Sequence, residues 1–135
     1  MINLYYDTRT GNVERFINKV IQITGWTAIR IEEGTNITEP GHLITYTTNF
    51  GKVPDKTSQF LALQKGLIHS VTSSGNRNWG RNFAVAANKI AEEFEIPLAF
   101  KFELSGTMED INQFIEIIKN QYYDSKRGSE KLDIA

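Results

Sequence analysis

The stretch Ser73–Gly80 combines polar side chains, two glycines and one large aromatic ring, that of Trp79. It follows an apolar segment, residues 66–71, and precedes a helical pattern that starts near Arg81. Open α/β sheets bind ligands where such a strand ends. Hydroxyl, amide and ring groups at this place suit a flat heteroaromatic ligand, although Ser-Gly and Gly-Asn pairs also mark ordinary surface turns.

A second polar stretch, Thr8–Asn12, also stands between an apolar run and a helical pattern. Its hydroxyl groups and the backbone N–H groups of a helix N-terminus suit one terminal phosphate, and Gly11 allows close backbone approach. The chain has neither Gly-x-x-x-x-Gly-Lys-Ser/Thr nor Gly-x-Gly-x-x-Gly, so neither a nucleoside triphosphate nor a dinucleotide is expected. Taken alone, the stretch more often marks an ordinary capped helix start.

A third stretch, Thr47–Gly51, supplies hydroxyl groups, the amide of Asn49 and the ring of Phe50. Amide edges suit the polar rim of a heteroaromatic ligand, and rings suit its faces. Two aromatic residues, Phe50 and Trp79, would then stand on adjacent loops that face a phosphate cradle. This combination favours a phosphorylated planar cofactor.

The elements that position these stretches follow from hydrophobic periodicity. The pattern predicts four helices, with Thr107 as the N-cap of the last, and five strands, at 2–6, 26–31, 42–47, 67–73 and 97–104. Strands that alternate with helices predict a flavodoxin-like doubly wound parallel α/β sheet of order 2-1-3-4-5, with helices on both faces. In that order the ends of strands one, three and four lie side by side. The segment 32–41 replaces one helix and is short for a parallel crossover.

Bulk composition restricts the function classes. The chain has 135 residues, a formal net charge of −1 and no Cys, which predicts one domain without disulfides, thiolate metal sites or a nucleic-acid surface. No signal peptide or membrane-length apolar run is found, so the expected location is the cytoplasm. His42 and His69 fall in predicted strands and are interpreted as structural, so no metal site is expected. Residues 124–135 are predicted to form a flexible C-terminal tail after a domain of residues 1–123.

Four motifs together resemble the NrdI family, and the resemblance runs from about Asn3 to about Phe114. Thr8-x-Thr10-Gly11-Asn12 alone is similar to the phosphate loop of flavodoxins, which usually carry a hydroxyl residue where Val13 stands and acids in the loop that corresponds to Ser74–Gly80. Both departures point to NrdI rather than to an ordinary flavodoxin. The motifs that carry the resemblance are residues 7–16, 46–54, 74–80 and 101–107.

The resemblance implies an FMN protein that serves class Ib ribonucleotide reductase, an accessory protein rather than a conventional enzyme. Its reduced flavin would react with O₂ and supply superoxide to the dimanganese centre of the reductase small subunit, building the tyrosyl radical. An unidentified electron donor would reduce the flavin. The residues expected to bind the cofactor are Thr8, Arg9, Thr10, Gly11, Asn12, Val13, Thr47, Thr48, Asn49, Phe50, Gly51, Ser74, Gly75, Asn76, Asn78, Trp79 and Gly80.

The charges of the three loops suggest a redox property. The loops Thr8–Asn12, Thr47–Pro54 and Ser73–Gly80 contain no Asp or Glu but contain Arg9, Lys52 and Arg77. Because fully reduced flavin is an anion, loops without acids favour it, and a basic rim, from Lys52 and Arg77, would guide superoxide. The alternative for Arg77 is that its side chain only points into solvent.

Three other functions stay open at this point. A flavodoxin-type electron carrier would have no oxidant-generating role. A phosphate-loop hydrolase would need a nucleophile, for which Asp7 is the sole candidate, and an interaction module would leave the pocket empty.

Overall fold

The computed structural model describes residues 2–48 and 51–134, and the side chains of residues 2–48 and 51–121. Among the described helices, none has both the length and the apolar character needed to span a membrane. The elements are β1 Asn3–Tyr6, α1 Asn12–Thr24, β2 Thr27–Arg30, β3 Gly41–Tyr46, α2 Asp55–Gln64, the 3₁₀-helix η2 Lys65–Leu67, β4 Ile68–Gly75, the 3₁₀-helix η3 Arg77–Asn82, α3 Ala86–Phe94, β5 Leu98–Glu103 and α4 Met108–Ile134.

The strands form one parallel sheet in the order β2-β1-β3-β4-β5, which confirms the predicted topology. Residues 31–40, all described, join β2 to β3 without a helix. Ile31 and Ile37 bury their side chains in the core on the way, and the Tyr5 hydroxyl donates a hydrogen bond to the Glu39 carbonyl at 2.7 Å. These contacts hold the short crossover against the sheet, so it needs no helix.

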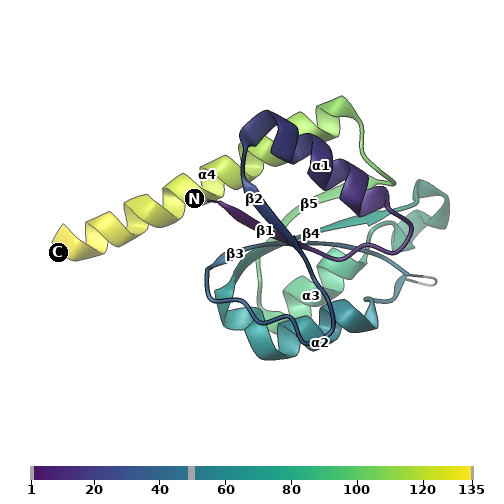
Figure 1. Ribbon diagram of the computed structural model, residues 1–135, viewed down its shortest axis with the longest axis horizontal. Coiled ribbons are helices and arrows are strands. Elements are labelled where there is room, and N and C mark those ends of the chain that lie inside the picture. The colour runs from purple at the N-terminus through teal and green to yellow at the C-terminus, as the bar shows by residue number, and fades with distance from the viewer. Residues whose placement is uncertain (1, 49–50, 135) are drawn as a thin grey trace.

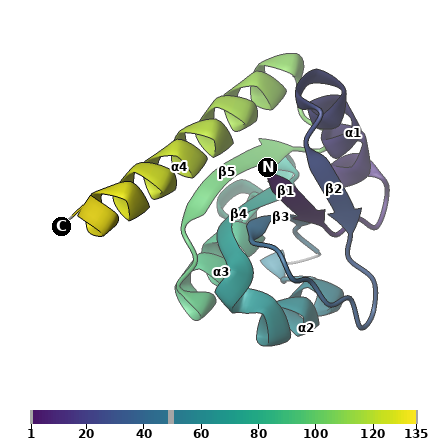
Figure 2. The same cartoon turned by 60° about the vertical axis from the view of Figure 1, so that its left-hand side comes forward.

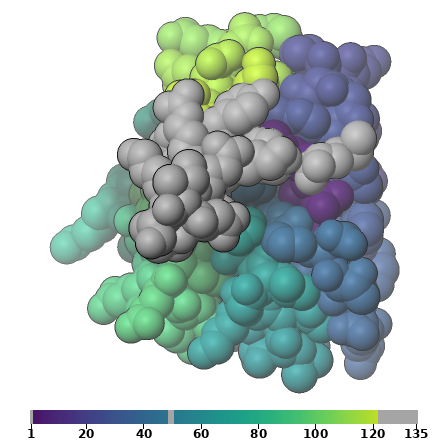
Figure 3. All heavy atoms as spheres, turned by 90° about the vertical axis from the view of Figure 1, so that its left-hand side faces the viewer, coloured from purple at the N-terminus to yellow at the C-terminus, as the bar shows by residue number. Residues whose placement is uncertain are grey.

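Two helices cover each face of the sheet: α1 and α4 on one, α2 and α3 on the other (Figures 1 and 2). Figure 3 shows the same layering from the side, with α1 and the first turns of α4 above and α2 and α3 below. Side chains of β1 alternate between the two cores, because successive strand residues point to opposite faces. Leu4 and Tyr6 join the α1–α4 core, while Tyr5 joins the α2–α3 core.

The last helix begins as predicted. The Thr107 hydroxyl accepts a hydrogen bond from Asp110 N at 3.1 Å, and an Asp110 carboxylate oxygen accepts one from Thr107 N at 2.9 Å. This reciprocal pair satisfies two backbone N–H groups that the helix start would otherwise leave without partners. The predicted core face of α4 is buried, and it consists of Ile111, Phe114, Ile115 and Ile118.

The prediction that the third helix begins near Arg81 is wrong. β4 continues to Gly75, η3 occupies residues 77–82, and α3 begins only at Ala86. The Ser73 hydroxyl accepts a hydrogen bond from Ala87 N at 3.0 Å, and the Thr47 hydroxyl accepts one from Ala86 N at 3.2 Å. Hydroxyl groups at the ends of β3 and β4 therefore cap α3 and fix where it starts.

The end of α4 also differs from expectation, since the helix continues through residue 134 instead of giving way to a loose segment after Asp124. The segment 124–134 has only four Lys, Arg and Glu residues beside a glycine, two serines and two aspartates, so its helix propensity is mixed. The apolar periodicity used to recognise helices is weak in this stretch, so periodicity alone misses it. The division into a domain and a flexible tail stays a prediction.

The two histidines lie near the start of β3 and β4, at the end of the sheet opposite to the strand ends described above. His42 is buried, and its Nδ1 is 2.7 Å from the Ser70 hydroxyl oxygen. Burial, and secondarily the neighbouring His69, lower the pKa of His42 from 6.5 to about 4. His69 is exposed, with its ring centroid 6.0 Å from that of His42.

Candidate functional site

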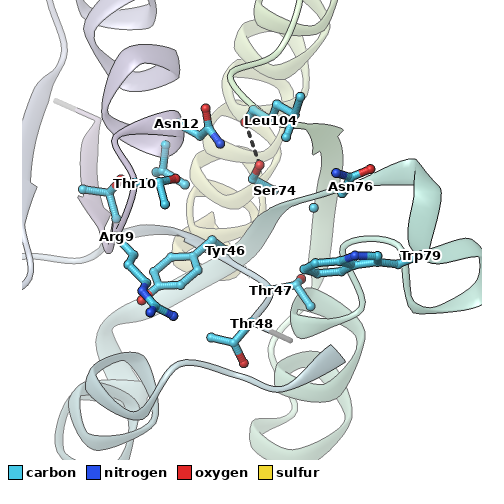
Figure 4. Close-up of a pocket in the computed structure, with 13 residues that line it drawn as sticks. Arg9, Thr10, Asn12, Tyr46, Thr47, Thr48, Ser74, Asn76, Trp79 and Leu104 are labelled. Carbon is cyan, nitrogen blue, oxygen red and sulfur yellow. Dashed lines mark hydrogen bonds between the residues drawn. The ribbon is translucent and has the colours of Figure 1, made fainter. Parts of the chain in front are cut away.

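A cavity of about 290 Å³ lies at the ends of β1, β3 and β4 (Figure 4). It brings together residues from all three stretches that the sequence singled out. No acidic side chain is among the described residues that line it. The lining residues are Thr8, Arg9, Thr10, Asn12, Val13, Tyr46, Thr47, Thr48, Ser74, Gly75, Asn76, Trp79 and Leu104.

The first wall of the cavity is the loop that leads from β1 into α1. Gly11 is the N-cap of α1 with φ 91°, a left-handed conformation that glycine adopts without strain. The first N–H groups of the 13-residue helix have no partner within it, and the helix dipole adds partial positive charge there. Together with the hydroxyls of Thr8 and Thr10, this wall can bind an anion such as a phosphate.

Asn12 is held in one orientation at the top of this wall. Its Oδ1 accepts hydrogen bonds from Arg15 Nη2 at 2.6 Å and from the Ser105 hydroxyl at 2.9 Å. Arg15 Nε also donates to the Ser105 hydroxyl at 3.1 Å. With the carbonyl oxygen engaged, the Nδ2 group faces the side on which Ser74 lies (Figure 4). Asn12 therefore presents a hydrogen-bond donor to the cavity.

Of the three predicted cations, only Arg9 lines the cavity. Lys52 lies 3.6 Å from an Asp55 carboxylate oxygen. Arg77 Nε lies 3.9 Å from a carboxylate oxygen of Glu103, and its guanidinium carbon is 4.5 Å from the Phe83 ring centroid. The paired carboxylates weaken the positive field expected from Lys52 and Arg77, and Arg77 does not simply point into solvent.

The second wall carries two aromatic rings, those of Tyr46 and Trp79 (Figure 4). Trp79 is 37% exposed, so a face of its indole is available for stacking. Burial, followed by the charge of Asp7, raises the pKa of the half-buried Tyr46, which keeps its phenol neutral. Tyr46 is not among the predicted binding residues, because it falls within the predicted strand 42–47. Its signal was its position directly before the polar stretch.

Several strand-end hydroxyls have partners within the protein. The Ser73 hydroxyl donates to the Ala84 carbonyl at 2.6 Å, and the Ser74 hydroxyl donates to the Leu104 carbonyl at 2.6 Å. The Thr48 hydroxyl donates to the Lys52 carbonyl at 2.9 Å. These groups shape the loops around the cavity. The Thr8 hydroxyl accepts a hydrogen bond from Gly11 N at 3.2 Å, so its O–H, together with the Thr10 hydroxyl and the amides, is left for a ligand.

The loop after β4 is stabilised by Asn76. Its Oδ1 accepts a hydrogen bond from Asn78 N at 2.9 Å, so its amide nitrogen remains for the cavity that it lines. Asn49 and Phe50 lie outside the described residues. The predicted binding residues that do not line the cavity are Gly11, Gly51, Asn78 and Gly80.

Asp7 lies beside the cavity without lining it. It is buried, and its Oδ2 accepts a hydrogen bond from the Thr57 hydroxyl at 2.7 Å, which in turn lies 2.8 Å from that of Thr45. Burial raises the pKa of Asp7 despite that hydrogen bond. An engaged carboxyl behind the wall has no open path to a substrate, which is unfavourable for a nucleophile.

The arrangement fits FMN in three respects. The first wall offers hydrogen-bond donors to a phosphate dianion, and the absence of acids among the described lining residues avoids repulsion. Tyr46 and Trp79 offer ring faces to a flat heterocycle. The volume is near the lower end of ligand pockets, so part of a bound FMN would remain exposed.

Comparison with protein families gives a match over residues 4–116 to the family described as NrdI flavodoxin-like. A protein NrdI of Bacillus licheniformis is 43% identical over 133 residues, 98% of this chain and 97% of the relative. The SPbeta prophage-derived protein NrdI of Bacillus subtilis is 40% identical over 114 residues, 84% of this chain and 88% of the relative.

Solved structures show the same fold at low sequence identity. A flavodoxin from Streptococcus pneumoniae TIGR4 has a TM-score of 0.66 at 19% identity, covering 91% of this chain and 98% of the flavodoxin. The flavodiiron core of Flv1 from Synechocystis has a TM-score of 0.64 at 16% identity, covering 94% of this chain and 36% of the other.

Proposed function

Because this chain belongs to the NrdI flavodoxin-like family, we propose that it binds FMN and supplies the oxidant for cofactor assembly in class Ib ribonucleotide reductase. Bound and reduced, the flavin would react with O₂ and provide superoxide to the dimanganese centre of the reductase small subunit. The metal and the resulting tyrosyl radical belong to that partner. This chain would act as an accessory redox protein.

One observation carries the binding part of the proposal. A helix N-terminus with two threonines and a donor-oriented asparagine shares one cavity with Tyr46, Trp79 and Arg9. Each half recognises one half of FMN, the phosphate and the ring system. A site that binds only phosphate would not need the rings of Tyr46 and Trp79. A pocket that binds only an aromatic ring would not need the anion-binding loop Thr8–Asn12.

The phosphate cradle, formed by loop Thr8–Asn12 and the N-terminus of α1, would bind and orient the cofactor. Thr8, Thr10 and Asn12 donate hydrogen bonds, while the N–H groups of α1 place partial positive charge next to the phosphate. Glu14 does not oppose this charge directly, because its carboxylate lies 3.9 Å from Arg30 Nη1 and accepts a 3.4 Å hydrogen bond from the Tyr6 hydroxyl. The first turn of the helix therefore keeps its positive end open to an anion.

The residues near the ring would keep it accessible and favour negative charge on it. Trp79 and Arg9 are both exposed, so small molecules such as O₂ can reach a ring held between these walls. Arg9 has no ion pair within the described residues and is free to stabilise an anion in the cavity. These features support the oxidant-generating role over that of a carrier, which must protect its electrons from O₂.

The test is assembly of the radical. A class Ib small subunit loaded with Mn(II) is mixed with the reduced FMN-loaded chain and O₂, and the tyrosyl radical is measured by electron paramagnetic resonance. We expect radical with the FMN-loaded chain but not with the same chain stripped of FMN. A reduced ordinary flavodoxin serves as the carrier control. Equal radical yields from that flavodoxin and from this chain would make a specific activating role untenable.

A further inference from the structure

Leu104 combines three properties that are unusual together. It is the first residue after β5, it lines the cavity, and it has φ 53°, in the left-handed region. Its side chain is 47% exposed. A left-handed conformation costs free energy for a residue with a Cβ, and Leu has no side-chain hydrogen bond to offset the cost.

The backbone of Leu104 is held in this conformation by β4. The Ser74 hydroxyl donates to the Leu104 carbonyl at 2.6 Å, and Leu104 N donates to the Gly75 carbonyl at 2.9 Å. Both bonds use only the main chain of residue 104, so glycine would make them equally well and without strain. The turn therefore explains the conformation but does not explain the leucine.

The hydrophobic core does not explain it either. Phe102, two residues earlier, is fully buried and stacks on Phe16 with ring centroids 3.9 Å apart. Leu104 belongs to neither core cluster of the described residues. Its side chain instead lies at the upper edge of the cavity as drawn in Figure 4, and the next residue, Ser105, donates to Asn12 Oδ1 at 2.9 Å.

We infer that Leu104 is a cofactor-contacting residue, which covers the carbon skeleton of the bound flavin nucleotide next to the phosphate cradle. This inference rests on the proposed FMN binding. A half-exposed apolar side chain outside the core gains free energy from burial only when a ligand covers it. The strain is thus tolerated in the free protein because the contact is made in the bound one.

The test separates folding from binding with three variants. Leu104→Gly removes strain and side chain together, and Leu104→Ala removes most of the side chain but keeps the strain. Glu95→Gly is the matched control, because Glu95 has φ 56° at the end of α3, is exposed and does not line the cavity. For each protein, the urea midpoint is measured without FMN, and the FMN dissociation constant is measured by flavin fluorescence.

We expect Leu104→Gly and Glu95→Gly to unfold without FMN at urea midpoints equal to or above that of the parent chain. Both Leu104 variants should weaken FMN binding about tenfold, as the loss of one partly buried Leu side chain predicts. Glu95→Gly should bind FMN like the parent chain.

Unchanged FMN binding in both Leu104 variants overturns the inference while leaving FMN binding by the chain intact. A lower urea midpoint for Leu104→Gly, when Glu95→Gly does not lower it, makes Leu104 a packing residue and also overturns the inference. A parent chain that takes up no FMN removes the proposed function itself, and the inference falls with it.

Discussion

At the scale of single residues, Asn12 shows how a side chain can be oriented by partners outside the cavity. Arg15 and Ser105 engage its Oδ1, so the donor group is left for the ligand. The sequence predicts Asn12 as a binding residue but does not reveal this arrangement. Arg15 lies on the same helix, whereas Ser105 is 93 positions away and reaches Asn12 only through the fold.

The substitution Asn12→Asp tests this role. It places a carboxylate where the donor faces the phosphate, so we expect the dissociation constant for FMN to rise about 10- to 100-fold. Riboflavin, which lacks the phosphate, should be affected by about threefold or less. The control is Asn18→Asp, the same charge change at an exposed position of α1. Equal losses for FMN and riboflavin would rule out a phosphate contact.

His42 predicts a stability effect far from the cavity. Its pKa is about 4 in the folded chain against 6.5 in the unfolded one, so the unfolded state takes up the proton first. The stabilisation from neutral His42 is full above pH 6.5 and is lost as the pH falls to 4. The complete loss corresponds to about 3 kcal/mol of unfolding free energy.

Chemical denaturation at pH 7 and pH 4.5 checks this expectation. The parent chain should lose much more stability between these pH values than His42→Gln, whatever the absolute stability of the variant. His69→Gln retains the buried imidazole and removes only the secondary cause of its lowered pKa, so it should lose slightly less stability than the parent chain and much more than His42→Gln. If His42→Gln and the parent chain lose the same stability, the buried histidine is not the titrating group.

At the scale of elements, strong periodicity made most of the fold predictable. The core faces of α1 and α4 and the five strands were recognised because their apolar residues recur at helical or strand spacing. The start of α3 was not, because the hydroxyls of Thr47 and Ser73 fix it from other elements. The sequence around the start of α3 does not reveal caps that come from residues distant in the chain.

The reciprocal cap of α4 gives a prediction at this scale. Thr107→Ala removes the hydroxyl that accepts from Asp110 N, and we expect unfolding free energy to fall by about 1 kcal/mol. Glu109→Gln removes a charge from the same turn and should lower the unfolding free energy by only about 0.3 kcal/mol. Urea unfolding of the three proteins measures both. A Thr107→Ala variant as stable as Glu109→Gln would mean that the cap contributes nothing beyond charge.

At the scale of the whole molecule, the topology assembles the site. Thr8, Thr47 and Ser74 are far apart in the sequence, and the sheet order 2-1-3-4-5 brings their strand ends together. This assembly was predictable because parallel sheets place all strand ends at one edge. Tyr46 and Leu104 are not among the predicted binding residues, because both fall at the ends of predicted strands. Only Tyr46 carries a local signal, its position directly before a polar stretch.

The charge distribution around the cavity gives a redox prediction. Arg9 is the cation that lines it, so Arg9→Gln should make the second one-electron midpoint potential of bound FMN about 40 mV more negative, equivalent to about 1 kcal/mol. Lys52→Gln removes an exposed charge that is already paired with Asp55, so it should shift this midpoint potential less than Arg9→Gln does. Spectroelectrochemical titration measures both variants. Equal shifts in the two variants would show that Arg9 stabilises the reduced flavin no more than the paired surface charge of Lys52.

The measurement that tests the account most directly is a fluorescence titration of FMN with the purified chain. Stacking on Trp79 and Tyr46 should quench the flavin emission, with one FMN per chain and a dissociation constant in the micromolar range or tighter. Emission that stays unchanged at a large molar excess of protein would contradict the assignment of this cavity to FMN, and with it the proposed oxidant-generating role.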